Sequence, residues 1–407
     1  MAESTRTVLL ILLVAFIALV GGRFYRGRKG RPQLFRVTTL SYLALGLALG
    51  GQGLGLLERH MLANLEPVVD LALGWIGILF GLQFEIRRLR RYPPRFFEIT
   101  LLQSLFTAAV VGFVIYLALG RFMPGEGESL WRVLVLIAAV GAVSSPAETA
   151  LAASAVSVVK RRFARLVHYV TSLDPLLPVV IFVFTTAFFH SSTEVGIGSA
   201  LAWTAVSALI GLVLGLLFYS YARHRHSENE LAMMIIAFTV FSGGIAAYLN
   251  LSSLFVNIVL GITLANLLPT SERIFRVLVS RERPVLIVLL VLVGANWIPF
   301  PQGRLVTVGA LLAIYLAGRV LGKVVSLAAA RPFVREELAQ GGWAAGLALL
   351  GQGGMSVALI ANYQFLFSGE ADTVAVSVVL CAVVFSEAFS AYAARRALAG
   401  DGEGGGR

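Results

Sequence analysis

The segment Ala139-Val-Gly-Ala-Val-Ser-Ser-Pro-Ala-Glu-Thr149 interrupts an apolar run that is long enough to cross a lipid bilayer. Pro146 has no backbone N–H, and its ring clashes with the preceding helical turn, so a helix is expected to break here. Ser144, Ser145 and Thr149 carry hydroxyl groups that can bond to the freed backbone groups. The segment therefore predicts a discontinuous membrane helix.

A second apolar run contains Leu350-Gly-Gln-Gly-Gly-Met-Ser356 at its centre. Each glycine costs about 1 kcal/mol relative to alanine inside a helix, so we expect this helix to unwind as well. The residues expected in this break are Gly351, Gln352, Gly353, Gly354 and Ser356. Interrupted segments in corresponding places of two halves are typical of inverted-repeat transporters, whose half-helix ends bind ions near the membrane midplane.

The composition predicts a polytopic, all-α membrane protein. The 407-residue chain is 58% hydrophobic and 14% charged, whereas soluble domains carry about 25% charged residues. Thirteen apolar runs reach the length of a membrane span. They lie at about 7–22, 37–57, 65–85, 97–119, 131–157, 164–190, 195–222, 230–249, 252–268, 284–300, 304–330, 342–366 and 372–395.

The basic residues predict the orientation of the chain in the membrane. The loops after odd-numbered spans, together with the C-terminal tail, hold 26 of the 33 Lys and Arg, and the opposite loops with the N-terminus hold five. Since positive loops stay cytoplasmic, we expect an inner or plasma membrane protein with its N-terminus outside and its C-terminus in the cytoplasm. The net charge of +11 is thus a topology signal and gives no reason to expect nucleic-acid binding.

We expect a single transmembrane transporter domain over residues 1–407. Its expected parts are an extra N-terminal helix with a basic loop (1–36), a first repeat region (37–190), linking helices (195–249), a second repeat region (252–395) and a flexible tail (396–407). The single cysteine, Cys381, excludes an intramolecular disulfide and a multi-cysteine metal site. No cofactor is expected, and no metal beyond a transported ion.

Three charged residues interrupt apolar spans: Asp174, Arg319 and Glu148. An Arg or Asp at the centre of a membrane helix costs roughly 2.5–3.5 kcal/mol, and such groups persist where they line a water-filled path or pair with one another. By helical rise, Asp174 lies roughly 14 Å from Arg165 and Arg319 roughly 18 Å from Arg331 along the membrane normal. Both depths are near the middle of a ~30 Å hydrocarbon core, so ion or proton movement is the first hypothesis.

At these residues the chain resembles the monovalent cation:proton antiporters, the superfamily of sodium/proton exchangers and potassium-efflux antiporters. The resemblance extends over about residues 37–395. The segment Ser41–Gly50 is similar to the family's early glycine-rich helix, and Trp75–Glu85 resembles its F-x-x-G-x-E helix end. These motifs are individually weak, but their order and spacing are fairly specific.

The resemblance also assigns residues to the expected site. Asp174 matches the ion-binding aspartate of the family's fifth core helix, and Arg319 matches the basic residue of its tenth. The Ser144–Pro146 and Gly351–Ser356 segments fall where the family has its two broken helices. The resemblance implies an all-α fold of inverted repeats with two discontinuous crossing helices, a homodimer, and secondary active exchange of Na⁺ or K⁺ for H⁺.

The residues suggest how such exchange could work. Burial disfavours the charged form of a carboxyl group, so Asp174 would hold either a proton or a cation, and this suffices for exchange by alternating access. Ser144, Ser145 and Thr149 would supply neutral oxygens, which suit a hard cation. A single acidic group favours electroneutral exchange, although Glu148 would change that count if it took part.

The two basic residues of the eleventh span have different expected roles. Arg319 is expected to balance the charge of Asp174 or Glu148, because a guanidinium group does not deprotonate in proteins. Lys323 lies one turn nearer the cytoplasm, and its long side chain is expected to snorkel towards the interface.

Two other functions remain open. One is a symporter for an organic anion on a related inverted-repeat fold, against which the central acidic residue stands. The other is a membrane sensor or scaffold that does not transport. Leu173 and Ser145 favour this second alternative. Many members of the family have Asn or Asp just before the key aspartate, and sodium-handling members often have Asp in the first break. An intramembrane enzyme is not expected, since the sequence shows no catalytic His pair, Gly-x-Ser-x-Gly motif or two-Asp pattern.

Overall fold

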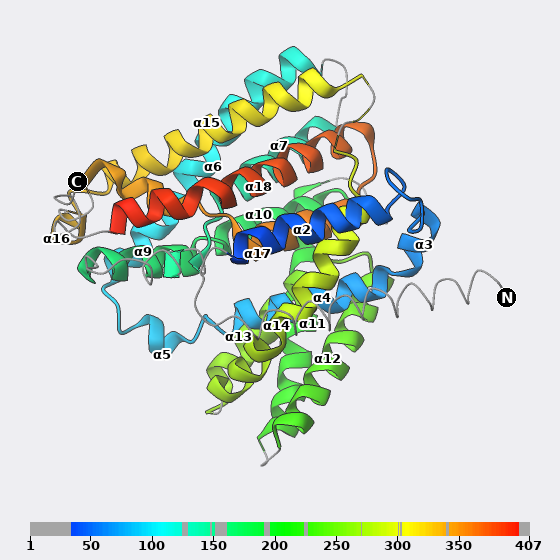
Figure 1. Cartoon of the computed structure of the whole chain (residues 1–407). Coiled ribbons are helices and arrows are strands. Elements are labelled where there is room, and N and C mark those ends of the chain that lie inside the picture. The colour runs from blue at the N-terminus through cyan, green and yellow to red at the C-terminus, as the bar shows by residue number, and fades with distance from the viewer. Residues whose placement is uncertain are drawn as a thin grey trace. The chain divides into compact units, whose positions relative to one another are not determined.

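The computed structural model describes residues 34–123, 129–146, 149–150, 161–190, 196–223, 227–269, 271–299, 301, 303–338 and 342–398. Within these ranges the chain is helical and has no β-strand, apart from one isolated bridge between Gly50 and Leu57 (Figure 1). The prediction of an all-α protein is confirmed. The expected first span at 7–22 and the expected tail at 396–407 fall wholly or mostly outside the described residues.

Most of the described helices have the length of membrane-crossing elements or of half of one. Their bounds are α2 Leu34–Leu49, α3 Arg59–Asn64, α4 Glu66–Gly81, α5 Ile86–Leu89, α6 Pro94–Phe122, α7 Ser129–Ala142, α9 Arg161–Leu173, α10 Leu176–Phe188, α11 Ile197–Ala222, α12 Glu228–Tyr248, α13 Ser253–Leu267, α14 Ser271–Ala295, α15 Leu305–Ala329, α16 Arg335–Leu338, the 3₁₀ helix η1 Gly342–Leu349, α17 Gly353–Leu366 and α18 Glu370–Leu398.

Five segments of the described chain are long and apolar enough to cross a bilayer by length and composition. They are Pro94–Phe122, Arg162–Phe188, Ile197–Ala222, Glu228–Tyr248 and Leu305–Ala329. The second of these covers α9 and α10 together. Of the shorter apolar helices, α7 covers the first half of the expected span at 131–157, and α13 covers nearly all of the expected span at 252–268. These lengths indicate a multi-pass membrane protein, and the count of thirteen spans stays a prediction.

The chain folds into two compact units that alternate along the sequence. Unit 1 comprises Met1–Arg91, Val183–Trp297 and Ala361–Leu366. Unit 2 comprises Tyr92–Phe182, Ile298–Ile360 and Phe367–Arg407. Both the N-terminal and the C-terminal halves of the chain contribute to each unit.

Unit 1 is built on the close packing of α4 and α13. A Cβ atom placed on Gly81 would lie 2.2 Å from the backbone oxygen of Ile258, so the two helix backbones can approach only because this residue is glycine. Asn257, which directly precedes Ile258 in α13, accepts through Oδ1 a hydrogen bond of 2.9 Å from the Ser242 hydroxyl of α12. Small residues and hydrogen bonds between polar side chains of neighbouring helices are the usual means of helix association in a membrane.

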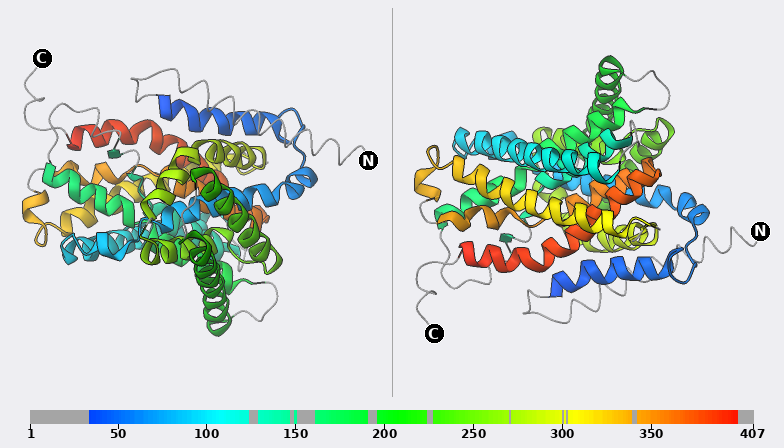
Figure 2. Two further views of the ribbon diagram at one scale, coloured as in Figure 1. Left: turned by 90° about the horizontal axis from the view of Figure 1, so that it is seen from below. Right: turned by 90° about the horizontal axis from the view of Figure 1, so that it is seen from above.

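Unit 2 is built around α6 and α15, which run side by side (Figures 1 and 2). The helices α7, α9, η1 and α18 pack around this pair. Helical structure in unit 2 is interrupted at three places: after α7, between α9 and α10, and between η1 and α17. The candidate functional residues gather at these breaks.

Candidate functional site

Three breaks in helical structure lie in unit 2. In the first, α7 ends at Ala142 and helical backbone resumes at residue 146, which leaves 143–145 non-helical. In the second, residues 174–175 form a turn between α9 and α10. In the third, residues 350–352 separate η1 from α17. We call these the 143–145 break, the 174–175 break and the 350–352 break.

At the 143–145 break, proline removes the backbone donor that the oxygen of Ala142 would have in a continuous helix. In a continuous helix, the oxygen of Ala142 would accept from the N–H of residue 146, but that residue is Pro146 and has no N–H. The Lys323 ammonium of α15 donates to this oxygen instead. A side chain thus replaces the backbone donor that the sequence removes.

The 174–175 break follows the same rule. The oxygen of Asp174 would accept from the N–H of residue 178 in a continuous helix, and that residue is Pro178. Here the Ser104 hydroxyl of α6 donates to the Asp174 oxygen at 3.1 Å. Both breaks are therefore held open by proline and stabilised by polar side chains from the central helix pair.

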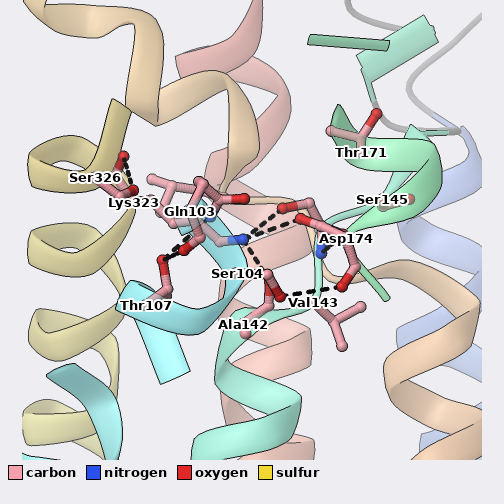
Figure 3. A network of polar contacts seen from close by, with 12 residues as sticks. Gln103, Ser104, Thr107, Ala142, Val143, Ser145, Thr171, Asp174, Lys323 and Ser326 are labelled. Atoms are coloured by element: carbon pink, nitrogen blue, oxygen red, sulfur yellow. Dashed lines mark hydrogen bonds and ion pairs between the residues drawn. The ribbon is translucent and has the colours of Figure 1, made fainter. Parts of the chain in front are cut away.

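The carboxylate of Asp174 lies inside unit 2 and is paired with Lys323 (Figure 3). Asp174 Oδ2 is 3.1 Å from Lys323 Nζ, and Asp174 Oδ1 accepts a 3.0 Å hydrogen bond from the backbone N–H of Ser144. The ammonium also donates to the Ser144 hydroxyl at 2.8 Å. Together with the bond to Ala142, these contacts use all three N–H groups of the ammonium.

The expectation that Lys323 snorkels towards the cytoplasm is wrong. Lys323 is 0% exposed, and Asp174 is 1% exposed. An unpaired charge at such a position is strongly unfavourable, and a buried ion pair persists only when further hydrogen bonds satisfy both partners. The carboxylate, the hydroxyl and the carbonyl around the ammonium meet this condition, so the side chain stays inside.

Arg319 contacts the two other chain breaks rather than Asp174. Its Nη2 atom donates to the oxygen of Val143 at 3.2 Å and to the oxygen of Leu350 at 2.9 Å. These oxygens follow the C-terminal ends of α7 and η1, where a helical segment carries partial negative charge. One buried guanidinium group thus compensates both ends. Among the described residues, the ion pair of Asp174 is with Lys323 and not with Arg319. The other expected partner of Arg319, Glu148, lies outside the described residues, so the charge-balancing role of Arg319 stays a prediction.

One face of α15 serves all of these contacts. Tyr315, Arg319 and Lys323 are spaced by four residues, and residues at this spacing lie on the same helix face. The Tyr315 hydroxyl accepts from Gln352 Nε2 at 2.7 Å, and Gln352 Oε1 accepts from the Ser386 hydroxyl of α18 at 3.1 Å. A regular polar stripe in an apolar span is a signal that Lys323 lies on the same inward face as Tyr315 and Arg319.

Gly353 brings the 350–352 break against the 143–145 break. Its φ angle is +60°, a conformation that side-chain-bearing residues rarely adopt. A Cβ atom at this position would also lie 2.4 Å from the Ser145 hydroxyl. Glycine is required here twice, once for the backbone conformation and once for the space.

The remaining predicted site residues make local contacts or lie elsewhere. The Thr149 hydroxyl donates to the oxygen of Ser145 at 3.1 Å, and the Ser356 hydroxyl donates to the oxygen of Gln352 at 3.1 Å. The predicted break residues Gly351 and Gly354 are buried and exposed, respectively. Glu148 lies outside the described residues, so its expected role stays a prediction.

The amino-acid sequence matches a known protein family. A sequence model of the family described as "Sodium/hydrogen exchanger, transmembrane" matches residues 8–391, which is nearly the whole chain. The chain belongs to this family. It is therefore a multi-pass membrane transporter of the cation:proton antiporter superfamily and not an enzyme.

The fold of this antiporter is similar to that of a solved relative, the sodium proton antiporter MjNhaP1 from Methanocaldococcus jannaschii, determined at pH 8. The TM-score is 0.67, and the match covers 97% of this chain and 99% of that chain. The sequence identity is 15%, so the likeness concerns the fold. No significant match was found among curated proteins.

We predict strong energetic coupling between Asp174 and Lys323. In Asp174→Asn or Lys323→Met, one buried charge loses its partner, which typically costs about 3–5 kcal/mol. In the double variant neither charge remains, so its loss should be smaller than the sum of the single losses by at least about 1 kcal/mol. Melting temperatures of the purified variants in detergent measure this coupling, and additive losses would contradict it.

We also predict that Arg319→Met loosens the 143–145 and 350–352 breaks together. Each hydrogen bond from a charged donor contributes about 1.5–3 kcal/mol, and two carbonyl oxygens lose theirs. Hydrogen exchange measured by mass spectrometry should accelerate in peptides from both breaks.

The matched control for this experiment is Arg304→Met. Arg304 pairs with the exposed Glu370 at 2.9 Å, and an exposed pair contributes roughly 0–1 kcal/mol. Faster exchange in only one of the two breaks of Arg319→Met, or equal effects in both variants, would contradict the assignment.

Proposed function

We propose that this antiporter exchanges one monovalent cation, Na⁺ or K⁺, for one H⁺, and that Asp174 is the group that both ions share. The observation that carries the proposal is the ion pair between Asp174 Oδ2 and Lys323 Nζ at 3.1 Å, buried among three helix breaks. A carboxylate in this position can be neutralised by a bound ammonium group, a proton or a metal cation, one at a time.

The surroundings of the Lys323 ammonium support cation binding. The ammonium is held by a carboxylate oxygen of Asp174, the hydroxyl of Ser144 and the backbone oxygen of Ala142. Carboxylate, hydroxyl and carbonyl oxygens are also the ligands that hard metal cations prefer. In our proposal, the transported cation competes with Lys323 for this set of oxygens.

Alternating access is supported by the way in which the site is built. Asp174, Lys323, Arg319 and the three breaks all belong to unit 2. A movement of unit 2 as one body would carry the complete site with it. The ligands would then keep their geometry while the site opened first to one side of the membrane and then to the other.

We predict that Asp174→Asn abolishes cation-driven proton flux in proteoliposomes, with a rate at least about 100-fold below that of the wild type, because an amide can neither bind a proton near neutral pH nor neutralise a cation. The matched control is Asp372→Asn. Asp372 is also buried and paired with an arginine, Arg132, at 3.2 Å, and its replacement should leave measurable exchange. Wild-type exchange by Asp174→Asn would reject the proposed site.

We propose an electroneutral stoichiometry, in which Lys323 keeps its proton throughout the cycle. Each transfer then replaces a proton on Asp174 by a single positive charge. If Lys323 released a proton in addition to Asp174 when the cation bound, two protons would exchange for one cation and the exchange would move net charge. Participation of Glu148 would also change the count.

We therefore predict that the equilibrium pH gradient produced by a fixed cation gradient is independent of an imposed membrane potential. Movement of one net charge per cycle would couple about 2.3 kcal/mol per 100 mV to the exchange, which a pH-sensitive dye in the vesicle lumen resolves. A gradient that shifts with the potential would establish electrogenic exchange.

The proposal extends to orientation and assembly. The excess of Lys and Arg in alternate loops supports an N-terminus outside and a C-terminus in the cytoplasm of an inner or plasma membrane. A homodimer is proposed from the family resemblance.

A further inference from the structure

One buried amide beside the site has an oxygen that no described residue satisfies. Gln103 of α6 is 1% exposed. Its Nε2 atom donates to the Thr107 hydroxyl at 3.1 Å, whereas its Oε1 atom has no hydrogen-bond partner in the part of the chain that the structure describes. A buried acceptor without a donor is unfavourable, so its presence calls for an explanation.

The orientation of this amide follows from its neighbour. Thr107 donates its one hydroxyl proton to the backbone oxygen of Gln103 at 2.8 Å. The hydroxyl can therefore only accept from the Gln103 side chain, which must turn its NH₂ group towards Thr107. The opposite orientation would place two oxygens without a proton against each other, so Oε1 is directed away from Thr107.

The amide lies on the turn of α6 that contacts the site. The next residue, Ser104, donates to the backbone oxygen of Asp174. One turn further, Thr107 packs against α15, where a Cβ atom on Gly322 would lie 3.0 Å from the Thr107 methyl carbon. Gly322 directly precedes Lys323 in the chain, and Figure 3 draws the amide beside that lysine and near the carboxylate.

None of the described residues donates a hydrogen bond to this oxygen while the ion pair is formed. The three N–H groups of Lys323 are used by Ala142, Ser144 and Asp174. The Ser104 hydroxyl is also used, by the Asp174 backbone. The carbonyl oxygen of Gln103 therefore has no partner among the described residues in this state, and Figure 3 draws the Gln103 side chain next to the ion pair.

We infer that Gln103 Oε1 is a ligand of the transported cation and helps to determine which cation is carried. The inference rests on the proposed role of Asp174. When a cation replaces Lys323 on the carboxylate, the amide supplies one neutral carbonyl oxygen to the cation's shell. Because an amide oxygen does not take up protons near neutral pH, it strengthens cation binding without strengthening proton binding.

The test is Gln103→Met, which keeps an unbranched side chain of similar length and replaces the carboxamide by a thioether, a weak acceptor. The matched control is Gln364→Met on α17. Gln364 is also buried, and its Oε1 also has no partner among the described residues, but it belongs to unit 1. Initial rates in proteoliposomes are measured at fixed pH against Na⁺, K⁺ and Li⁺ in turn.

We expect Gln103→Met to raise the apparent KM for the carried cation about tenfold, as loss of one good ion ligand implies. Its kcat should stay within about twofold of wild type, and its relative preference among the three cations should change. Gln364→Met should match the wild type in KM and preference. An unchanged KM and preference in Gln103→Met would mean that the amide oxygen binds water only, and would overturn the inference. Equal changes in both variants would also overturn it.

Asp174→Asn in the same preparations separates the two proposals. If it abolishes exchange while Gln103→Met keeps a normal KM, only the role of Gln103 is rejected. If it exchanges normally, the site itself is rejected. Should Gln103→Met fail to accumulate, Gln103→Asn keeps the carboxamide but withdraws its oxygen by one methylene. The same rise in KM is then expected, and an unchanged KM overturns the inference.

Discussion

The buried pair of Asp174 and Lys323 is the interaction on which unit 2 depends. Neither charge could stay inside alone, because removal of an ion from water costs more than a single contact returns. The pair is stable because Ser144 and the carbonyl oxygen of Ala142 complete the hydrogen bonds of both partners. The same contacts join α15, the end of α7 and the turn after α9. The same atoms therefore form the site and hold the helices of unit 2 together.

The helix breaks are ordered structures rather than gaps in the fold. Pro146 and Pro178 each remove a backbone donor at a defined position, and a side chain from another helix takes over the abandoned oxygen. Since unsatisfied backbone groups are especially unfavourable within a membrane, these replacements explain how non-helical backbone persists at this depth. The donors, Lys323 and Ser104, come from the central helix pair of α15 and α6.

Much of this arrangement can be predicted from the sequence, because prolines, glycines and intramembrane charges act locally. Pro146 and Asp174 announce a break and a site without any knowledge of the fold. The sequence does not predict that Lys323 pairs with Asp174 while Arg319 bonds to the backbone of the two other breaks. The two residues share a helix face and differ in depth by roughly 6 Å, so only the placement of the three breaks decides which one reaches the carboxylate. The sequence does not single out Gln103 either, because Thr100, Ser104 and Thr107 lie on the same face of its helix and such polar residues commonly serve only helix packing.

The contact of Arg319 with Val143 and Leu350 has a consequence for acid and alkaline conditions. Both acceptors are backbone oxygens, which do not titrate, and a guanidinium group keeps its proton at any pH that a cell experiences. The contact of Arg319 with the two broken helices is thus independent of pH. In the proposed cycle, the neighbouring Asp174 takes up and releases the proton, while Lys323, one helical turn from Arg319, keeps its own. An exchanger arranged in this way can respond to pH at its centre while its frame remains the same.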